Sequence, residues 1–205
     1  GITRADAGLP EYGFVYCCFN NPSKIDPQTF AVWMRIMKQV PDSVLWLLAS
    51  SSHGIDRLRR EAGKYGIDPE RLVFASRLPK DKHLERHRLA DLFLDTFVYN
   101  AHTTASDALW AGLPILTLQG TTFQSRVCAS LLTALGLEEL TIAKNEHQYE
   151  EWALMLSSEP TRLQELRFQL DEKRRTGLPF ATAWFARQLE QAFLALWAAY
   201  SERKK

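Results

Sequence analysis

The chain has 205 residues, 46% of them hydrophobic, and its 25 lysines and arginines nearly balance its 24 aspartates and glutamates. That length and apolar fraction fit one large domain, so a single domain over residues 1–205 is expected. The net charge of +1 excludes a long-range field that would attract nucleic acid, and no apolar run reaches the roughly 18 residues that span a membrane.

The three cysteines, Cys17, Cys18 and Cys128, form an odd set with one adjacent pair. This pattern disfavours a disulfide framework and favours a reducing compartment, so we expect a cytoplasmic protein. The first residues contain neither the basic nor the apolar region of a signal peptide, and the chain opens at Gly1 without a methionine. We therefore expect a fragment of a longer protein.

Short apolar runs alternate with longer amphipathic stretches as far as residue 118. Strands are predicted at residues 13–19, 43–49, 71–75, 91–96 and 114–118. Because each run is nearly continuously apolar, the strands are expected to be covered by helices on both faces. The predicted fold class is therefore α/β, a Rossmann-like doubly wound parallel sheet.

A helix is predicted to begin at Pro27 and to stop near Pro41, because proline is favoured in a first helical turn and ends a helix elsewhere. Four large apolar residues recur on it at helical spacing and are expected in the core: Phe30, Trp33, Met34 and Met37.

The end of the chain is predicted to be a helical segment at about residues 145–201. Its last part places five apolar residues in one stripe: Phe185, Leu189, Phe193, Leu196 and Tyr200. This stripe must pack against something, either the domain's own sheet or a partner lobe outside this chain.

Ligands of doubly wound sheets bind outside the carboxyl ends of the strands, so polar residues that follow each strand are the candidates for a site. After the first strand, Asn20, Asn21 and Lys24 lie in a proline-bounded loop. The Lys24 ammonium could neutralise a diphosphate, although a solvated loop lysine is the alternative.

The third predicted strand is followed by Lys80, His83 and Arg86, spaced three residues apart on a predicted helix. They could form a cationic face toward the crevice, or an outer face paired with Asp81 and Glu85. His83 and His87 have the spacing of helical metal ligands, but no further ligand completes a zinc set, so no metal is expected.

The fourth predicted strand leads into His102, Thr103 and Thr104 at an expected helix start. Free amides and the helix dipole make such a start a phosphate site. The alternative is a capping box in which Thr104 caps the helix and Asp107 answers it. Asp107 could instead accept hydrogen bonds from ribose hydroxyls.

Several catalytic motifs are missing from the sequence. It has no glycine-rich dinucleotide loop, no P-loop and no serine elbow, and its cysteines lie within predicted strands or helices. The chain is therefore expected to bind a leaving group rather than to supply a nucleophile.

Several strings occur together and in order: CCFNNPSKIDP, VPDSVLWLL, RLVFASRLPKDKHLERHRLADLFLDT, YNAHTTASDALWAGLPILTL and SRVCASLL. They resemble the catalytic region of the O-linked N-acetylglucosamine transferase and SPINDLY family, from about Gly8 to the final helix. Members have two Rossmann-like lobes of the GT-B type, usually after tetratricopeptide repeats. The chain resembles the second lobe only. The resemblance therefore implies a nucleotide-sugar-binding fragment of a larger enzyme, and this fragment is expected to transfer no sugar by itself.

The resemblance implies a set of donor-site residues. Lys24 is similar to the family's catalytic lysine on the diphosphate, whereas Asn21 stands where many members have glutamine. Leu78 would offer backbone groups to the base, with Lys80 and His83 beside base and ribose and Arg86 supporting them. The phosphate-binding helix start would be His102, Thr103 and Thr104, and Asp107 would bind the ribose.

The implied reaction transfers N-acetylglucosamine from UDP-GlcNAc, as co-substrate, to serine or threonine hydroxyls of an acceptor protein. No cofactor or metal is expected, because Lys24 and helix amides would stabilise the departing diphosphate. A GDP-fucose donor, as in SPINDLY-like members, is one alternative, and a non-catalytic scaffold module is another.

Overall fold

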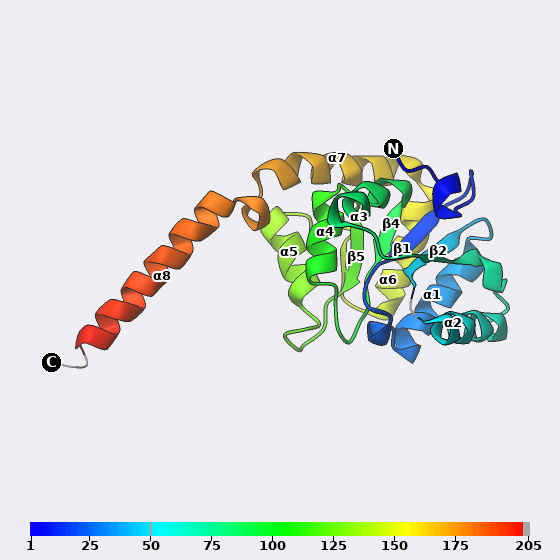
Figure 1. Ribbon diagram of the computed structural model, residues 1–205, viewed down its shortest axis with the longest axis horizontal. Helices are drawn as coiled ribbons and strands as arrows, with labels where there is room; N and C mark the ends of the chain where they lie inside the picture. Colours follow the sequence, from blue (N-terminus) through cyan, green and yellow to red (C-terminus); the bar gives the residue numbers. More distant parts are fainter. Residues whose placement is uncertain (50, 203–205) are drawn as a thin grey trace.

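The computed structural model describes residues 1–49 and 51–202, which form a parallel sheet flanked by helices (Figure 1). Its six strands lie in the order β3-β2-β1-β4-β5-β6. Their bounds are β1 Val15–Cys18, β2 Val44–Leu48, β3 Leu72–Ala75, β4 Leu92–Leu94, β5 Ile115–Leu118 and β6 Ile142–Ala143. Every pairing is parallel, so the predicted α/β class is confirmed. The two-residue strand β6 was not predicted, because it is too short to leave an apolar pattern.

Helices cover both faces of the sheet. Right-handed crossovers that run in opposite directions from the sheet centre place their helices on opposite faces. Thus α1 and α2 cover one face, where α1 packs beside α6, and α4 lies on the other beside α3, α5 and α7. Their bounds are α1 Pro27–Gln39, α2 Ser52–Lys64, α3 Lys80–Arg86, α4 Thr103–Trp110, α5 Val127–Leu135, α6 Glu146–Ser158 and α7 Pro160–Thr176.

The start of α1 follows from its sequence. The Asp26 carboxylate accepts hydrogen bonds from the amides of Gln28 and Thr29, both at 3.0 Å, and Pro27 occupies the first helical position, where no amide is needed. The four apolar residues predicted for its core face are buried: Phe30, Trp33, Met34 and Met37.

The strand order reverses between β1 and β4: from β1 the chain adds β2 and β3 on one side, and then β4, β5 and β6 on the other side of β1. Tyr16 of β1 pairs with Leu92 of β4, and Val15 pairs with Val44 of β2 on the other side. The segments that follow β1 and β4 therefore meet at the carboxyl-terminal ends of these two strands, although some 75 residues separate them in sequence. This place is called the β1/β4 edge. This is the place where doubly wound sheets bind ligands.

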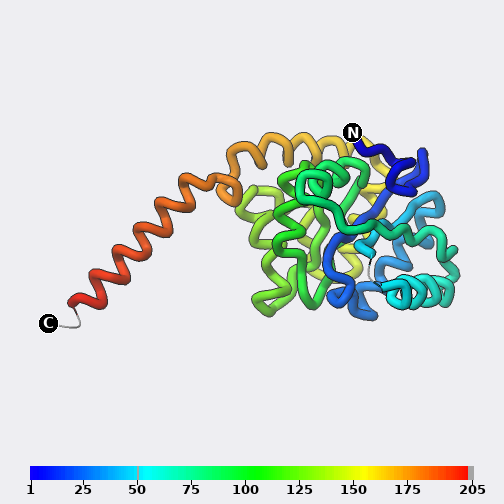
Figure 2. Tube along the Cα trace, viewed as in Figure 1, coloured from blue at the N-terminus to red at the C-terminus, as the bar shows by residue number. Residues whose placement is uncertain are grey.

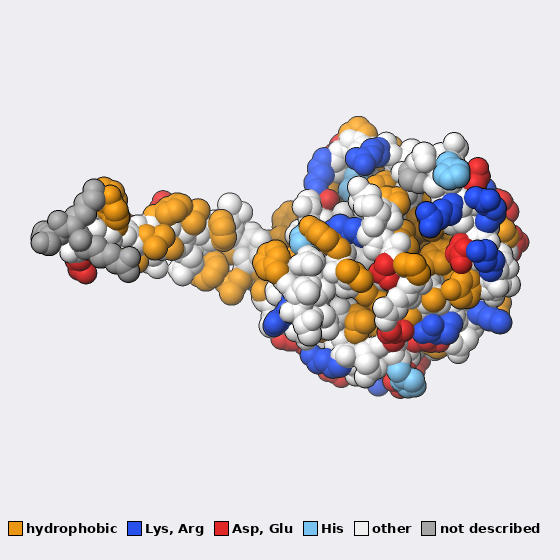
Figure 3. Space-filling model, turned by 90° about the horizontal axis from the view of Figure 1, so that it is seen from below, with side chains coloured by type: hydrophobic (Ala, Val, Ile, Leu, Met, Phe, Trp, Pro, Cys, Tyr) orange, Lys and Arg blue, Asp and Glu red, His pale blue; other side chains and the backbone are white. Residues whose placement is uncertain are grey.

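The last helix, α8 (Thr182–Glu202), leaves the body of the molecule (Figures 1 and 2). None of its described residues is buried, and its apolar side chains are exposed along its length (Figure 3). Phe193, Leu196 and Trp197 are 60%, 67% and 68% exposed. The alternative in which this stripe closes the domain's own sheet is therefore wrong. None of the described helices is both long and apolar enough to cross a membrane.

Candidate functional site

The candidate site lies where the chain leaves β1 and β4, and a buried carboxylate occupies its base. Asp95, the first residue after β4, is fully buried. Its Oδ1 accepts hydrogen bonds from Asn20 Nδ2 (3.2 Å) and from the amides of Thr96 (2.8 Å) and Ala101 (2.6 Å). Its Oδ2 accepts the hydroxyl of Thr117 on β5 at 2.7 Å. One side chain thus connects β1, β4 and β5.

Lys24 lies in the short 3₁₀ helix η2 (Pro22–Lys24) and reaches across to the loop after β4. Its Nζ donates to the backbone carbonyl of Asn100 at 2.9 Å and lies 3.9 Å from the centre of the Tyr99 ring. Partial burial lowers the pKa of Lys24, and the negative charge of Asp95 opposes that shift. The ammonium is therefore held beside the crevice and is not a freely solvated loop lysine.

Asn21 has a local role in this turn. Its Oδ1 accepts the amide of Ser23 at 3.1 Å and so caps η2, while the residue remains exposed. The side chain fixes the turn that precedes Lys24, as asparagine does in many such caps. A contact of Asn21 with a ligand stays a prediction.

The start of α4 presents free amides at the same edge. Thr103 is the first helical residue, and the first backbone bond of the helix runs from Ser106 N to His102 O at 3.0 Å. The amides before Ser106 point out of the helix end, as at any helix start. Thr103 is exposed there, so its hydroxyl can face a ligand.

The capping-box alternative at α4 is wrong. His102 occupies the cap position and forms no side-chain cap bond, and Thr104 lies two residues past that position, inside the helix. The Thr104 hydroxyl donates instead to Asn20 Oδ1, and Asp107 pairs with a residue of α3. The imidazole of His102 lies 4.9 Å from the Tyr99 ring, between centroids, and its Nε2 lies 3.3 Å from the carbonyl of Gln124.

Helices α3 and α4 face each other through Asp107. Lys80 Nζ forms an ion pair with Asp107 Oδ1, and His83 Nε2 lies 3.9 Å from Asp107 Oδ2. Burial, aided by the nearby charge of Arg86, lowers the pKa of His83 to about 4, so this imidazole is neutral near pH 7. The alternative of an outer face paired with Asp81 and Glu85 does not hold for Lys80 or His83, since both face Asp107 and Glu85 pairs with Lys82 and Arg88, each at 3.0 Å.

Arg86 does not share a cationic face with Lys80. It is 2% exposed, its guanidinium lies 4.5 Å from the Phe19 ring and 5.9 Å from the Trp46 ring, and its Nη1 donates to the carbonyl of Ser76 at 2.6 Å. It packs beneath His83 through Phe19, whose ring is 5.5 Å from that imidazole. Support, and not ligand contact, is the role that this placement allows.

Leu78 lies in the loop between β3 and α3. It is 38% exposed, and its backbone forms no hydrogen bond with another described residue. Its amide and carbonyl are therefore available to a ligand, as the resemblance implies. The structure thus brings α3 and α4 together at Asp107, links α4 to the segment after β1 through Thr104 and Asn20, and buries Arg86 behind Phe19 and His83.

The two histidines of metal-ligand spacing are packed together without further ligands. The rings of His83 and His87 are 4.7 Å apart and nearly perpendicular, and His87 Nδ1 lies 2.7 Å from the carbonyl of His83. Among residues 1–49 and 51–202, no group of three histidine, cysteine, aspartate or glutamate side chains could hold a metal ion.

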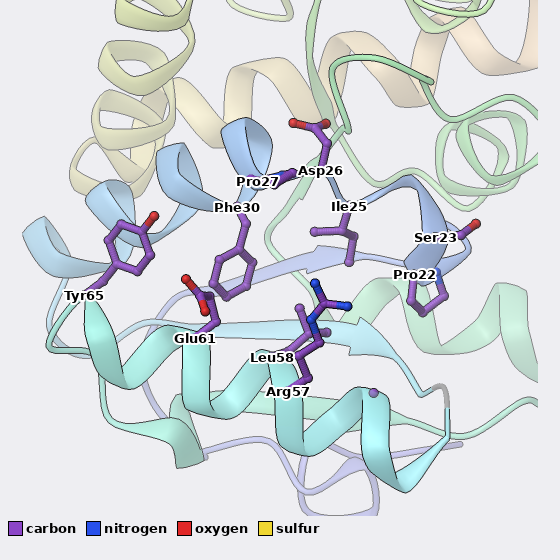
Figure 4. Close-up of a pocket in the computed structure, with 11 residues that line it drawn as sticks. Pro22, Ser23, Ile25, Asp26, Pro27, Phe30, Arg57, Leu58, Glu61 and Tyr65 are labelled. Atoms are coloured by element: carbon purple, nitrogen blue, oxygen red, sulfur yellow. The ribbon is translucent and has the colours of Figure 1, made fainter.

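A separate cleft of about 440 Å³ lies between α2 and the segment from η2 to the start of α1 (Figure 4). Phe30, Leu58 and Tyr65 line its apolar part, with Arg57 and Glu61 on α2. No predicted donor-site residue lines this cleft, so it is distinct from the crevice edge.

Three residues that organise the site were not predicted: Asp95, Tyr99 and Asn100. The only sequence signal was the aspartate in the LDT string that ends the fourth strand. An acidic residue at the end of an otherwise apolar strand indicates a buried polar contact, but not which donors surround it.

Comparisons with known proteins agree with this fold. Residues 2–189 match glycosyl transferase family 41. A probable UDP-N-acetylglucosamine–peptide N-acetylglucosaminyltransferase SEC of Arabidopsis thaliana is 39% identical over 95% of the chain, and the one named SPINDLY of Petunia hybrida is 34% identical over 93%. The solved structure of a Thermobaculum terrenum O-GlcNAc transferase mutant superposes with a TM-score of 0.85, at 31% identity over 90% of the chain.

The chain spans only part of each relative: 20% of the Arabidopsis protein, 21% of the Petunia protein and 36% of the Thermobaculum chain. Within that part, the match runs through every strand of the sheet and through all the predicted site residues. The chain belongs to glycosyltransferase family 41.

Proposed function

We propose that this chain is the donor-binding lobe of a protein O-glycosyltransferase that transfers N-acetylglucosamine from UDP-GlcNAc to serine or threonine hydroxyls. The observation that carries the proposal is the meeting of the Lys24 ammonium and the free amides of α4 at the β1/β4 edge. Lys24 contacts Asn100, three residues before the first residue of α4, and both a lysine ammonium and a helix start favour phosphate oxygens. The relatives' printed names support the donor and the peptide acceptor.

In the proposed reaction the bond between the sugar's anomeric carbon and the diphosphate oxygen breaks, and the acceptor hydroxyl oxygen bonds to that carbon. Negative charge grows on the diphosphate as it leaves. Lys24 and the amides of Thr103 and Thr104 stabilise that charge more in the transition state than in the bound donor. These fixed positive groups replace a divalent ion, so we propose that the reaction needs no metal.

The nucleoside would lie along the Lys80, His83 and Asp107 cluster. The Asp107 carboxylate, already paired with Lys80, can accept ribose hydroxyls, and the neutral His83 imidazole offers a flat face to base or ribose. The exposed backbone groups of Leu78 would hydrogen-bond to the base. Because backbone groups would hold the base, no side chain of this cluster selects uracil over guanine. GDP-fucose is therefore the donor to test against UDP-GlcNAc.

A first catalytic lobe and the acceptor would belong to the rest of a longer protein, since the chain covers only 20% of the Arabidopsis relative. We propose that the apolar stripe of α8 packs on that lobe, because five large apolar side chains along one helix stay exposed otherwise: Phe185, Leu189, Phe193, Leu196 and Tyr200. The acceptor's general base is assigned to no residue of this chain.

Calorimetric titration with UDP and with GDP tests the proposal. We expect UDP to bind, GDP to bind at least about tenfold more weakly, and both Lys24→Ala and the His102→Ala, Thr103→Ala double variant to weaken UDP by about 10- to 100-fold. Lys38→Ala is the matched control, because Lys38 is an exposed lysine at the far end of α1.

If GDP binds more strongly than UDP, the proposed donor becomes GDP-fucose in place of UDP-GlcNAc. Loss of binding in Lys38→Ala equal to that in Lys24→Ala would refute the assigned diphosphate site. If a folded chain binds neither nucleotide at millimolar concentration, the experiment is repeated on the full-length natural protein, and failure there leaves the scaffold alternative.

A further inference from the structure

The buried carboxylate of Asp95 is connected to both groups that would hold the diphosphate. On one side it fixes the loop 96–101 through the amides of Thr96 and Ala101. On the other side it holds Asn20, whose own oxygen accepts the Thr104 hydroxyl in the first turn of α4.

The loop 96–101 is closed by further bonds that converge on the same side chains. Thr96 Oγ1 accepts from Asn20 Nδ2 at 2.8 Å and donates to the carbonyl of Tyr99 at 2.6 Å, while Asn100 Nδ2 donates to the carbonyl of Thr96 at 2.7 Å. Tyr99 and Asn100 are the two residues that Lys24 contacts. The position of the Lys24 ammonium is therefore set by a loop that Asp95 anchors.

We propose that Asp95 is a positioning residue for glycosyl transfer, which acts through the loop 96–101 on Lys24 and through Asn20 on the start of α4. The inference rests on the proposed function, because it assigns Lys24 to the departing diphosphate. Burial raises the pKa of Asp95, and the hydrogen bonds that it accepts act against that shift; its ionised form favours the protonated form of Lys24.

Complete burial of a carboxylate lowers the stability of the fold unless its oxygens accept hydrogen bonds. Asp95 is 0% exposed and accepts four hydrogen bonds, three of them from groups in or beside the site and one from Thr117. If this residue only stabilised the fold, an apolar residue of similar size could take its place without the desolvation cost. The cost is consistent with a carboxylate that orders a charged site.

The test is a double-mutant cycle between Lys24→Ala and Asp95→Asn, with kcat and KM measured on the full-length natural protein. Asparagine keeps an acceptor for the loop amides but loses the charge and weakens the bonds. We expect Asp95→Asn to lower kcat by about 10- to 100-fold while KM for the donor changes by less than about threefold. Added to Lys24→Ala, it should lower kcat by no more than about twofold further, because both act on one step.

Tyr16→Phe is the matched control. It removes a buried hydroxyl that donates to the carbonyl of Ala153 at 3.1 Å and contacts no residue of the proposed site. We expect it to lower the melting temperature and to leave kcat within about twofold of the unmodified protein. That contrast separates positioning from stability.

The inference would be overturned if the two losses of kcat multiplied independently in the double variant. An unchanged kcat in Asp95→Asn, or an equal loss of kcat in Tyr16→Phe, would also overturn it. If Asp95→Asn does not fold, Thr96→Val takes its place in the same cycle, since it removes the hydroxyl that holds Tyr99. If Lys24→Ala alone leaves kcat unchanged, the proposed function fails first, and the inference fails with it.

Discussion

The β1/β4 edge and the helix α8 contrast in how their side chains are satisfied. At the edge, Asn20, Asp95 and Thr117 are at most 1% exposed, and each has hydrogen-bond partners within the chain. Along α8, Phe193 and Trp197 are 60% and 68% exposed and bury little against the body. The polar side chains at the edge are paired within this chain, whereas the apolar side chains of α8 remain exposed.

The largest expected effect compares two tryptophans, one from each region. Trp33 is fully buried, and its Nε1 donates to the hydroxyl of Tyr149 at 3.3 Å, whereas Trp197 lies on α8. Trp33→Ala should lower the free energy of unfolding by about 3–5 kcal/mol through the cavity it leaves. Trp197→Ala should change it by less than about 0.5 kcal/mol, as measured by urea denaturation of this chain.

The same Trp197→Ala substitution should behave differently in the full-length protein. If α8 packs on a first lobe, burial of the indole makes the substitution cost about 1.5–3 kcal/mol there. The measurement is thermal or urea unfolding of both lengths side by side. An equally small effect in both would contradict the proposed contact of α8 with another lobe.

A pH effect of intermediate size is expected from the histidines under the crevice. Burial lowers the pKa of His87 to about 4, and the same cause lowers that of His83 to about 4, while both are near 6.5 when unfolded. Between pH 6.5 and 4 the unfolded state binds more protons, so stability falls as pH falls and levels off below about pH 4.

Urea unfolding at pH 7 and pH 5 measures this effect. We expect the two histidines to remove about 1–3 kcal/mol between those values, after allowance for the partial exposure of His83. His87→Gln should flatten the dependence, because it removes the more buried titrating group. A pH dependence unchanged in that variant would show that other groups cause it.

The smallest expected effect concerns the support of the buried edge. The Tyr149 hydroxyl donates to the backbone carbonyl of Asp95 at 3.1 Å and accepts from Trp33. Tyr149→Phe should cost about 1–2 kcal/mol, since it leaves the Trp33 Nε1 and that carbonyl without this partner. Tyr12→Phe is the control, because Tyr12 is 80% exposed, and it should leave the melting temperature unchanged.

Local sequence patterns were enough to predict most of the fold. The five longer strands and the helix that starts at Pro27 are read from apolar runs and from proline placement, which depend on neighbours a few residues apart. The strand pattern placed Lys24 and Thr103 in segments that follow predicted strands, and the resemblance added donor-site roles for them and for Asp107. In the structure Lys24 follows β1, and Thr103 and Asp107 lie on α4, the helix after β4. The strand β6 was missed because two residues carry no period.

The sequence by itself determined the doubly wound class and the family, because apolar periodicity and ordered motifs are local properties. Only the tertiary structure decided that Thr104 donates to Asn20, that Arg86 is buried under the crevice, and that Asp95 anchors the loop beneath Lys24. These contacts join residues tens of positions apart, and burial and hydrogen bonding between such residues depend on how the helices and strands pack. The exposure of the α8 stripe also became known only from the tertiary structure, since an amphipathic pattern shows which face of a helix is apolar but not what covers that face.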